Sequence, residues 1–213
     1  MDLTKHINPK NTILLVIDKQ AGYFDPVLVG ERNMSLPENS VEILENIDRF
    51  IEDARKNNVE VVWTQMVEDA EDSPKVTSEL MKADPGGIRS ISKPGTRSFD
   101  IYGRVKPLPR EKILTKYYYN AFAKTDLSEH LIARNITTVI LVGGYAPRCI
   151  LSTAVGANSD DLFVVIVNDA VTYQVNTKRE IPGLFFFVDS LLGSAPSSRE
   201  ITETWKTKYP LKL

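Results

Sequence analysis

Short apolar runs alternate along this chain with segments in which apolar residues recur at helical spacing. The clearest run is Thr12–Ile17, which is continuously apolar after its first residue. A continuous rather than alternating run predicts a strand buried on both faces, as in a parallel sheet. From Val41 to Ala54 apolar residues return every three or four positions, and Pro37 and Asn58 bracket the pattern. This segment is predicted to be an amphipathic helix.

The same alternation continues to the end of the chain. Further strands are predicted at residues 59–64, 113–115, 138–142 and 163–167, and helices at 125–134, 147–158 and 177–192, with a short last helix opening at 197–200. Strands that alternate with helices predict an α/β fold, here a doubly wound, Rossmann-like parallel sheet of about five to six strands with helices on both faces. Ligands of such sheets bind outside the carboxyl ends of the strands.

One long connection, residues 66–111, departs from this pattern. It is rich in charge, proline and glycine, and only residues 78–82 suggest a short helix within it. Structureless connections of this length are unusual in compact domains and tend to be functional. We expect a single domain over residues 1–213, in which this excursion forms a lid, an oligomer arm or a plain surface loop.

Composition and charge narrow the classes of function. The formal net charge of −2 predicts no general affinity for nucleic acid or for anionic membranes. No apolar stretch approaches the roughly 18 residues of a membrane span, and the N-terminus lacks the apolar run of a signal peptide. A single cysteine cannot form an internal disulfide, which favours a cytoplasmic location. Without a Gly-x-Gly-x-x-Gly or Walker A motif, no nucleotide cofactor is predicted.

Three chemically active residues fall at predicted strand ends: Asp18, Lys116 and Cys149. A carboxylate that ends an apolar run, as Asp18 does, is costly unless it is partnered. Cys149 lies in the predicted first turn of a helix, where the helix N-terminus would lower the pKa of its thiol. Each residue has an ordinary alternative: a turn residue, a surface lysine and a small buried hydrophobe. Together they predict a nucleophilic site.

Motifs around these residues resemble those of a known family. They are Asp18 with Gln20 and Tyr23; Pro94-Gly95-Thr96; Lys116 with Asn120-Ala121-Phe122 and Thr125-Asp126-Leu127; Gly143, Cys149 and Thr153-Ala154; and Asn168-Asp169-Ala170. In this order, over residues 12–204, the chain resembles the isochorismatase-like cysteine hydrolases. That family includes nicotinamidases, N-carbamoylsarcosine amidohydrolases, ureidoacrylate amidohydrolases and biuret hydrolases.

The resemblance implies a role for each residue. Cys149 would be the nucleophile, Asp18 its proton acceptor and donor, and Lys116 the cation that supports both. The family also has a cis peptide bond before the nucleophile helix, which would here join Gly144 to Tyr145. The backbone N–H groups of Tyr145 and Cys149 would then form the oxyanion hole.

The chain departs from the family pattern at several positions. Gly144 stands where a β-branched residue is common, and Ala146 stands where a hydroxyl residue is common. Nicotinamidases carry a histidine-containing metal pattern after the second strand, whereas residues 63–69 contain no histidine here. With only His6 and His130 in the chain, we predict no metal and no cofactor.

The function predicted from these motifs is a metal-independent cysteine hydrolase that cleaves a C–N bond of a small amide, ureido or carbamoyl compound through a thioester. Two alternatives remain: a vinyl-ether hydrolase of the isochorismate type, and a catalytically silent relative that acts as a binding protein. Candidates for the substrate pocket are Tyr23, Trp63, Tyr118 and Phe122.

The segment 184–192 contains more apolar residues than one helix face can hold. Such a helix is expected to be covered by a partner subunit as well as by its own sheet. We therefore predict a homo-oligomer, either a dimer or a tetramer.

Overall fold

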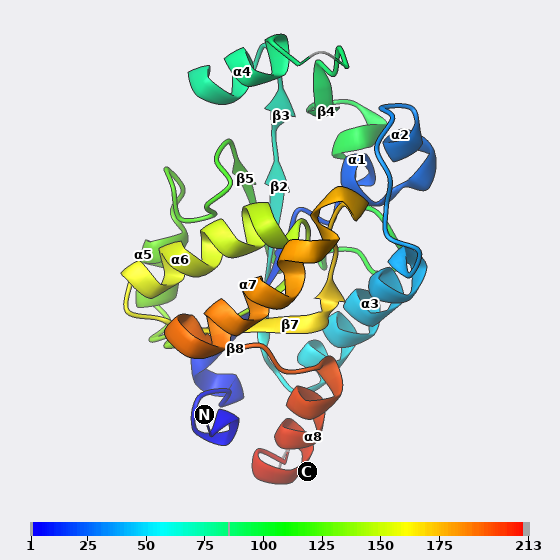
Figure 1. Ribbon diagram of the computed structural model, residues 1–213. Coiled ribbons are helices and arrows are strands. Elements are labelled where there is room, and N and C mark those ends of the chain that lie inside the picture. The colour runs from blue at the N-terminus through cyan, green and yellow to red at the C-terminus, as the bar shows by residue number, and fades with distance from the viewer. Residues whose placement is uncertain (1, 85, 211–213) are drawn as a thin grey trace.

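The computed structural model describes residues 2–84 and 86–210 and has a six-stranded parallel sheet at its centre (Figure 1). The strand order is β5-β2-β1-β6-β7-β8, and each neighbouring pair is parallel. The strands are β1 (Thr12–Ile17), β2 (Glu60–Met66), β5 (Lys112–Lys116), β6 (Thr138–Gly143), β7 (Phe163–Val171) and β8 (Gly193–Ser194). The predicted doubly wound α/β fold is confirmed.

Helices cover both faces of this sheet (Figure 1). They are α3 (Ser40–Lys56) and α8 (Ser198–Lys208) on one face, and α5 (Leu127–Ile132), α6 (Leu151–Ser159) and α7 (Ile181–Phe187) on the other. Alternate residues of β1 supply the two cores: Leu14 and Val16 face α3, whereas Leu15 and Ile17 face α6. A strand that feeds two cores must be apolar at every position, which explains its unbroken run.

Two predicted helices have interrupted forms. The nucleophile helix opens with a π-helical turn, Ala146–Ile150, before α6 begins. The predicted helix at 177–192 comprises a 3₁₀ segment, Val175–Glu180, then α7, then a second π-helical turn, Val188–Leu192. Pro182 lies in the first turn of α7, where its missing N–H has no helical partner to lose.

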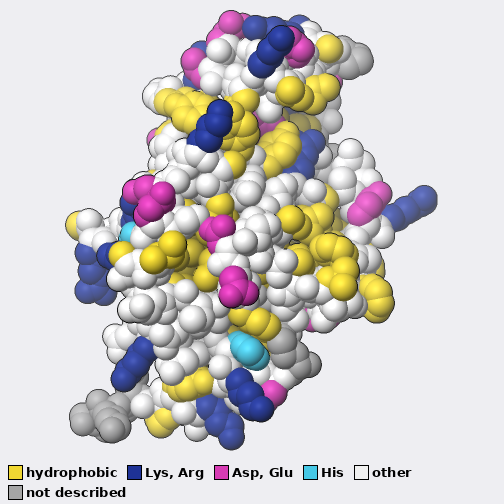
Figure 2. Space-filling view, turned by 90° about the vertical axis from the view of Figure 1, so that its left-hand side faces the viewer, with side chains coloured by type: hydrophobic (Ala, Val, Ile, Leu, Met, Phe, Trp, Pro, Cys, Tyr) yellow, Lys and Arg dark blue, Asp and Glu magenta, His cyan; other side chains and the backbone are white. Residues whose placement is uncertain are grey.

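The long connection has structure of its own. It holds β3 (Glu68–Asp69), α4 (Lys75–Lys82), β4 (Ser90–Ser92) and a 3₁₀ turn, Arg97–Phe99; β3 pairs with β4 in a small antiparallel sheet. The short helix α1 (Ala21–Phe24) lies against this region, and a second short helix, α2 (Pro26–Gly30), packs on α1. Together they stand above the carboxyl ends of the main strands (Figure 1). Charged side chains of both signs cover the top of the molecule (Figure 2).

Among the described residues, no helix combines the length and the apolar character that crossing a membrane requires.

Candidate active site

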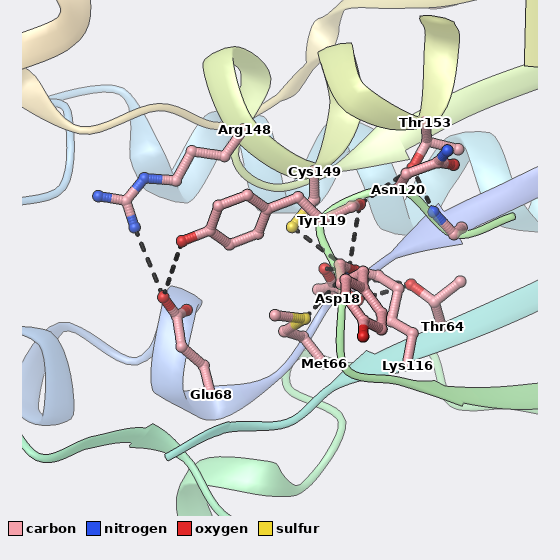
Figure 3. A network of polar contacts seen from close by, with 12 residues as sticks. Asp18, Thr64, Met66, Glu68, Lys116, Tyr119, Asn120, Arg148, Cys149 and Thr153 are labelled. Carbon is pink, nitrogen blue, oxygen red and sulfur yellow. Dashed lines mark hydrogen bonds and ion pairs between the residues drawn. The ribbon is translucent and has the colours of Figure 1, made fainter. Parts of the chain in front are cut away.

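The structure brings Asp18, Lys116 and Cys149 together at the carboxyl edge of the sheet (Figure 3). Lys116 is the last residue of β5, Asp18 follows β1, and Cys149 lies in the turn after β6. Lys116 Nζ lies 2.7 Å from Asp18 Oδ2 and donates to Cys149 Sγ at 3.3 Å. All three side chains are buried, so their charges interact with little screening by water.

Asp18 is held in place by the neighbouring strand. Its backbone N–H donates to the carbonyl oxygen of Thr64 at 3.2 Å and to Thr64 Oγ1 at 3.1 Å. The Thr64 hydroxyl in turn donates to Asp18 Oδ1 at 2.6 Å. Asp18 also has a φ of +48°, a left-handed conformation that aspartate tolerates better than most residues. These contacts fix the carboxylate and leave its second oxygen to Lys116.

Lys116 is fully enclosed by acceptors. Besides Asp18 and Cys149, its ammonium group contacts the carbonyl oxygens of Tyr118 at 3.2 Å and Tyr119 at 3.4 Å. Burial works against the charged form, but the Asp18 carboxylate and the Cys149 sulfur outweigh it and raise the pKa of Lys116 above its ordinary value. The site therefore favours the charged form of this lysine.

Cys149 behaves differently from the sequence prediction. Burial raises the pKa of its thiol far above the ordinary value; the Lys116 ammonium lowers that pKa only in part, and the carboxylates of Asp18 and Glu68 raise it again. The prediction of a lowered pKa for Cys149 is wrong. The free energy that a thiolate loses when it is removed from water exceeds the free energy that it gains from one nearby cation.

The backbone before Cys149 is shaped by two glycines. Gly143 has a φ of +114°, and a Cβ there would lie 2.0 Å from the carbonyl oxygen of Ile17. A Cβ on Gly144 would lie 2.7 Å from the methyl carbon of Thr172, which is why the β-branched residue common in the family does not fit this chain. The Gly144–Tyr145 peptide bond is cis. The N–H of Tyr145 donates to no group among the described residues, so it is free to receive an oxyanion.

A cavity of about 400 Å³ opens next to the nucleophile turn, where Arg148, the neighbour of Cys149, forms part of its wall. Its lining comes from the loop after α2, the excursion, the loop after β5, the nucleophile turn and the segment after β7: Met34, Glu68, Thr77, Leu80, Met81, Asp84, Ile88, Ile91, Tyr119, Arg148, Gln174 and Asn176. The cavity is a natural place for a substrate, because it is concave and its lining combines apolar side chains with polar and charged ones that could orient a ligand.

Three of the four predicted pocket residues lie elsewhere. Trp63 is fully buried in the core between β2 and α3, and its Nε1 donates to Glu111. Tyr118 lines a separate hollow with Tyr117, and Phe122 packs against the core on the α6 face. Only the fold decides which side of the sheet or loop each aromatic ring takes. Tyr23 does lie beside the cavity, where its hydroxyl donates to Glu68 at 2.9 Å.

Sequence reasoning missed Glu68, the buried carboxylate of the cavity wall. Its Oε1 accepts from the Tyr119 hydroxyl at 3.4 Å and lies 3.8 Å from Arg148 Nη1 (Figure 3). Burial and the charge of Glu68 raise the pKa of Tyr119 to about 12, so its hydroxyl remains a donor. A signal was present in the sequence, because Glu68 is a carboxylate that directly follows the apolar pair Met66-Val67.

The histidines lie away from this site. His6 stacks on Phe163, and His130 lies 2.7 Å from Glu60. Within residues 2–84 and 86–210, no group of three or more histidine, cysteine, aspartate or glutamate side chains is arranged to hold a metal ion.

Comparisons with known proteins agree with this architecture. The family model for the isochorismatase domain matches residues 12–177. A probable isochorismatase of Pseudomonas chlororaphis is 30% identical, over 78% of this chain and 73% of its own. The ureidoacrylate amidohydrolase RutB of Cronobacter sakazakii is 25% identical, over 87% and 84%.

Among solved structures, a cysteine hydrolase from Pseudomonas syringae pv. phaseolicola 1448A has the same fold, with a TM-score of 0.81 over 95% of this chain and 96% of that one, at 19% identity. The parallel α/β sheet with polar residues at its carboxyl edge defines the class, and the match to the domain model identifies the family. The chain belongs to the isochorismatase domain family.

Proposed function

We propose that this protein is a cysteine hydrolase that cleaves a C–N bond of a small amide, ureido or carbamoyl compound through a thioester. The observation that carries the proposal is Lys116, whose ammonium lies within hydrogen-bonding distance of both the Asp18 carboxylate and the Cys149 sulfur. A thiol, an acid and a cation in one buried cluster are the parts of a nucleophilic site. The relatives named as amidohydrolase and cysteine hydrolase agree with this reading.

The chemistry begins from a neutral thiol. Cys149 Sγ attacks the substrate carbonyl carbon while Asp18 accepts the thiol proton, so no free thiolate has to exist beforehand. The N–H groups of Tyr145 and Cys149 hold the oxyanion that forms. When the C–N bond breaks, the protonated Asp18 gives its proton to the leaving nitrogen, and ammonia or an amine departs.

The thioester is then hydrolysed by the same groups. Asp18, again a carboxylate, accepts a proton from water as the water oxygen attacks the thioester carbon. Collapse of the second tetrahedral intermediate breaks the C–S bond and returns the proton to the sulfur. Lys116 keeps its charge throughout and offsets the negative charge that moves between Asp18 and Cys149.

Substitution of Cys149 tests the proposal directly. Cys149→Ala should remove turnover in an ammonia-release assay with a panel of amides and ureido compounds, while its circular dichroism spectrum remains that of the parent. Asp18→Asn should lose nearly as much kcat, and the double variant should lose little more, because residues that act as a unit have non-additive effects. Retention of more than a few per cent of activity by Cys149→Ala would refute the nucleophile assignment.

The reaction is proposed to need no metal. We expect activity to survive exhaustive chelation and metal analysis to find less than one equivalent of zinc. Loss of activity on chelation, with recovery on addition of one particular metal, would contradict this.

A second candidate is hydrolysis of a vinyl ether, which the name of the Pseudomonas chlororaphis relative suggests. That reaction needs an acid but no thiol. Cys149→Ala would therefore keep vinyl-ether hydrolysis and lose amide hydrolysis, whereas Asp18→Asn would lose both. Measuring both activities in these two variants separates the candidates.

A further inference from the structure

The outer wall of the cavity carries an acid and a base that face one another without a hydrogen bond. Glu68 Oε1 and Arg148 Nη1 lie 3.8 Å apart, beyond hydrogen-bonding distance. Both oxygens of Glu68 are anchored, because the Tyr23 hydroxyl donates to Oε2 and the Tyr119 hydroxyl donates to Oε1. The carboxylate is therefore held in place, whereas the Arg148 side chain is partly exposed.

Both groups have unused hydrogen-bonding capacity. A carboxylate offers about four lone-pair positions, and the two tyrosines occupy two of those on Glu68. The Arg148 guanidinium donates no hydrogen bond to any residue in the described part of the chain, and its side chain is 40% exposed. Since a guanidinium carries five N–H donors, Arg148 can donate hydrogen bonds to an acceptor atom of a ligand.

We infer that Glu68 and Arg148 together recognise a second, uncharged amide or ureido group of the substrate, separate from the bond that is cleaved. Arg148 would donate to its C=O oxygen and Glu68 would accept from its N–H. In a planar amide the oxygen and nitrogen atoms lie about 2.3 Å apart, as the bond lengths require. Two hydrogen bonds that diverge slightly from these atoms reach a donor and an acceptor that lie farther apart than the oxygen and nitrogen themselves. The 3.8 Å spacing suits such a group. The inference depends on the proposed function in one respect only: the proposed hydrolysis defines which bond of the substrate is cleaved at Cys149.

The charges of the wall oppose a carboxylate in this place. Of the charged residues that line the cavity, Glu68 and Asp84 are acidic and Arg148 is basic. A carboxylate ligand would satisfy Arg148 but would set its second oxygen against Glu68, with no proton between them. An amide avoids this repulsion because its nitrogen carries the hydrogen that Glu68 needs. The wall therefore selects diamides and ureides over the corresponding amido acids.

Matched pairs of ligands test this selection without any turnover. Malonamide, succinamide and glutaramide differ from malonamic, succinamic and glutaramic acid only by an amide in place of a carboxylate. Binding to the Cys149→Ala protein is measured by calorimetry at neutral pH. We expect the best diamide to bind about 10- to 100-fold more tightly than its amido acid, because a charge-assisted hydrogen bond is exchanged for a repulsion.

Glu68→Gln in the same background is the decisive variant. Glutamine keeps the shape but can donate to a carboxylate, so the preference for the diamide should fall at least tenfold. Glu71→Gln is the matched control, because Glu71 is exposed and lies outside the cavity lining, and it should keep the parent's preference. Arg148→Gln, which removes the cation at a half-exposed position, should weaken binding of the diamide about tenfold.

Several results would overturn the inference. These are an amido acid that binds as tightly as its diamide, an unchanged preference in Glu68→Gln, or no binding of any diamide. Failure of the proposed function looks different: the Cys149-containing protein would release no ammonia from diamides, while the binding preference and its loss in Glu68→Gln remained.

Discussion

Cys149 is buried more deeply than its place in the sequence suggests, and its reactivity should reflect this. Burial raises the pKa of the thiol above its ordinary 9.0, and Lys116 offsets only part of that rise. Alkylation by iodoacetamide should therefore be slow at neutral pH and keep accelerating beyond pH 9. Lys116→Ala should move the profile to still higher pH, because it removes the nearby cation.

The control for this experiment is Lys124→Ala, which removes an exposed lysine of the same loop. Its labelling profile should match that of the parent. A profile that levels off below pH 7, or superimposable profiles for the parent and Lys116→Ala, would show that this description of the thiol is wrong.

Thr64 is the residue that positions Asp18. Its hydroxyl both donates to the Asp18 carboxylate and accepts from the Asp18 backbone. Thr64→Val keeps the shape of the side chain but frees the carboxylate to rotate, so kcat should fall about 10- to 100-fold with little change in KM. Thr64→Ser should restore most of the rate, since it returns the hydroxyl. Equal losses in the valine and serine variants would point to packing instead of the hydrogen bond.

At the scale of the elements, a buried ion pair joins α3 to the end of the excursion. Lys19 Nζ lies 2.7 Å from Asp48 Oδ1, and Lys19 is fully buried. Asp48 Oδ2 accepts from the backbone N–H groups of Arg104 and Val105 at 3.0 and 3.3 Å. Lys19 donates to the carbonyl oxygens of Tyr102 and Val105. This pair anchors the segment that leads into β5 and therefore supports the placement of Lys116.

Asp48→Asn should lower the free energy of unfolding by about 3–5 kcal/mol, because it leaves the Lys19 charge buried without a partner. Burial already lowers the pKa of Lys19 below the ordinary 10.5, although Asp48 opposes this. At pH values between the lowered pKa of Lys19 in the folded protein and its ordinary pKa in the unfolded chain, the unfolded chain binds more protons than the folded protein. Stability should thus recover as pH rises toward 10.5.

Urea unfolding at several pH values measures both effects. The matched control is Asp53→Asn on the same helix, whose lysine partner is exposed, and it should change stability by about 0–1 kcal/mol. A loss in Asp48→Asn no larger than that of the control would contradict the anchoring role.

At the scale of the whole molecule, apolar surface remains uncovered around α7. Leu184 and Val188 are buried against the sheet, whereas Phe186 is 74% and Leu191 67% exposed. If a second copy of the chain covered this face, burial of the apolar side chains would favour association of the two copies.

We expect light scattering at micromolar concentration to give two or four times the monomer mass. Phe186→Glu should shift the population toward monomer, because it places a charge in the interface. Ile132→Glu is the control, since Ile132 is equally exposed but lies on α5. A monomer mass for the unmodified protein would disprove the prediction.

The sequence by itself determined five of the six strands, their ends and the residues that they carry, but not the two-residue strand β8. Unbroken apolar runs such as Thr12–Ile17 indicate strands that are buried on both faces. Because such strands alternate with helices along the chain, the pattern predicts a doubly wound parallel α/β sheet. Asp18, Lys116 and Cys149 could be predicted as neighbours because the carboxyl ends of parallel strands meet at one edge.

Only the tertiary structure decided the environment of those residues. The pKa of Cys149 depends on burial by distant segments, which no local pattern contains. The same holds for the cavity: Trp63 lies in the core because of the face that β2 turns toward α3, and Glu68 meets Arg148 because the excursion folds over the nucleophile turn. Local spacing fixes which side chains share an edge, but packing between segments far apart in the chain fixes what surrounds them.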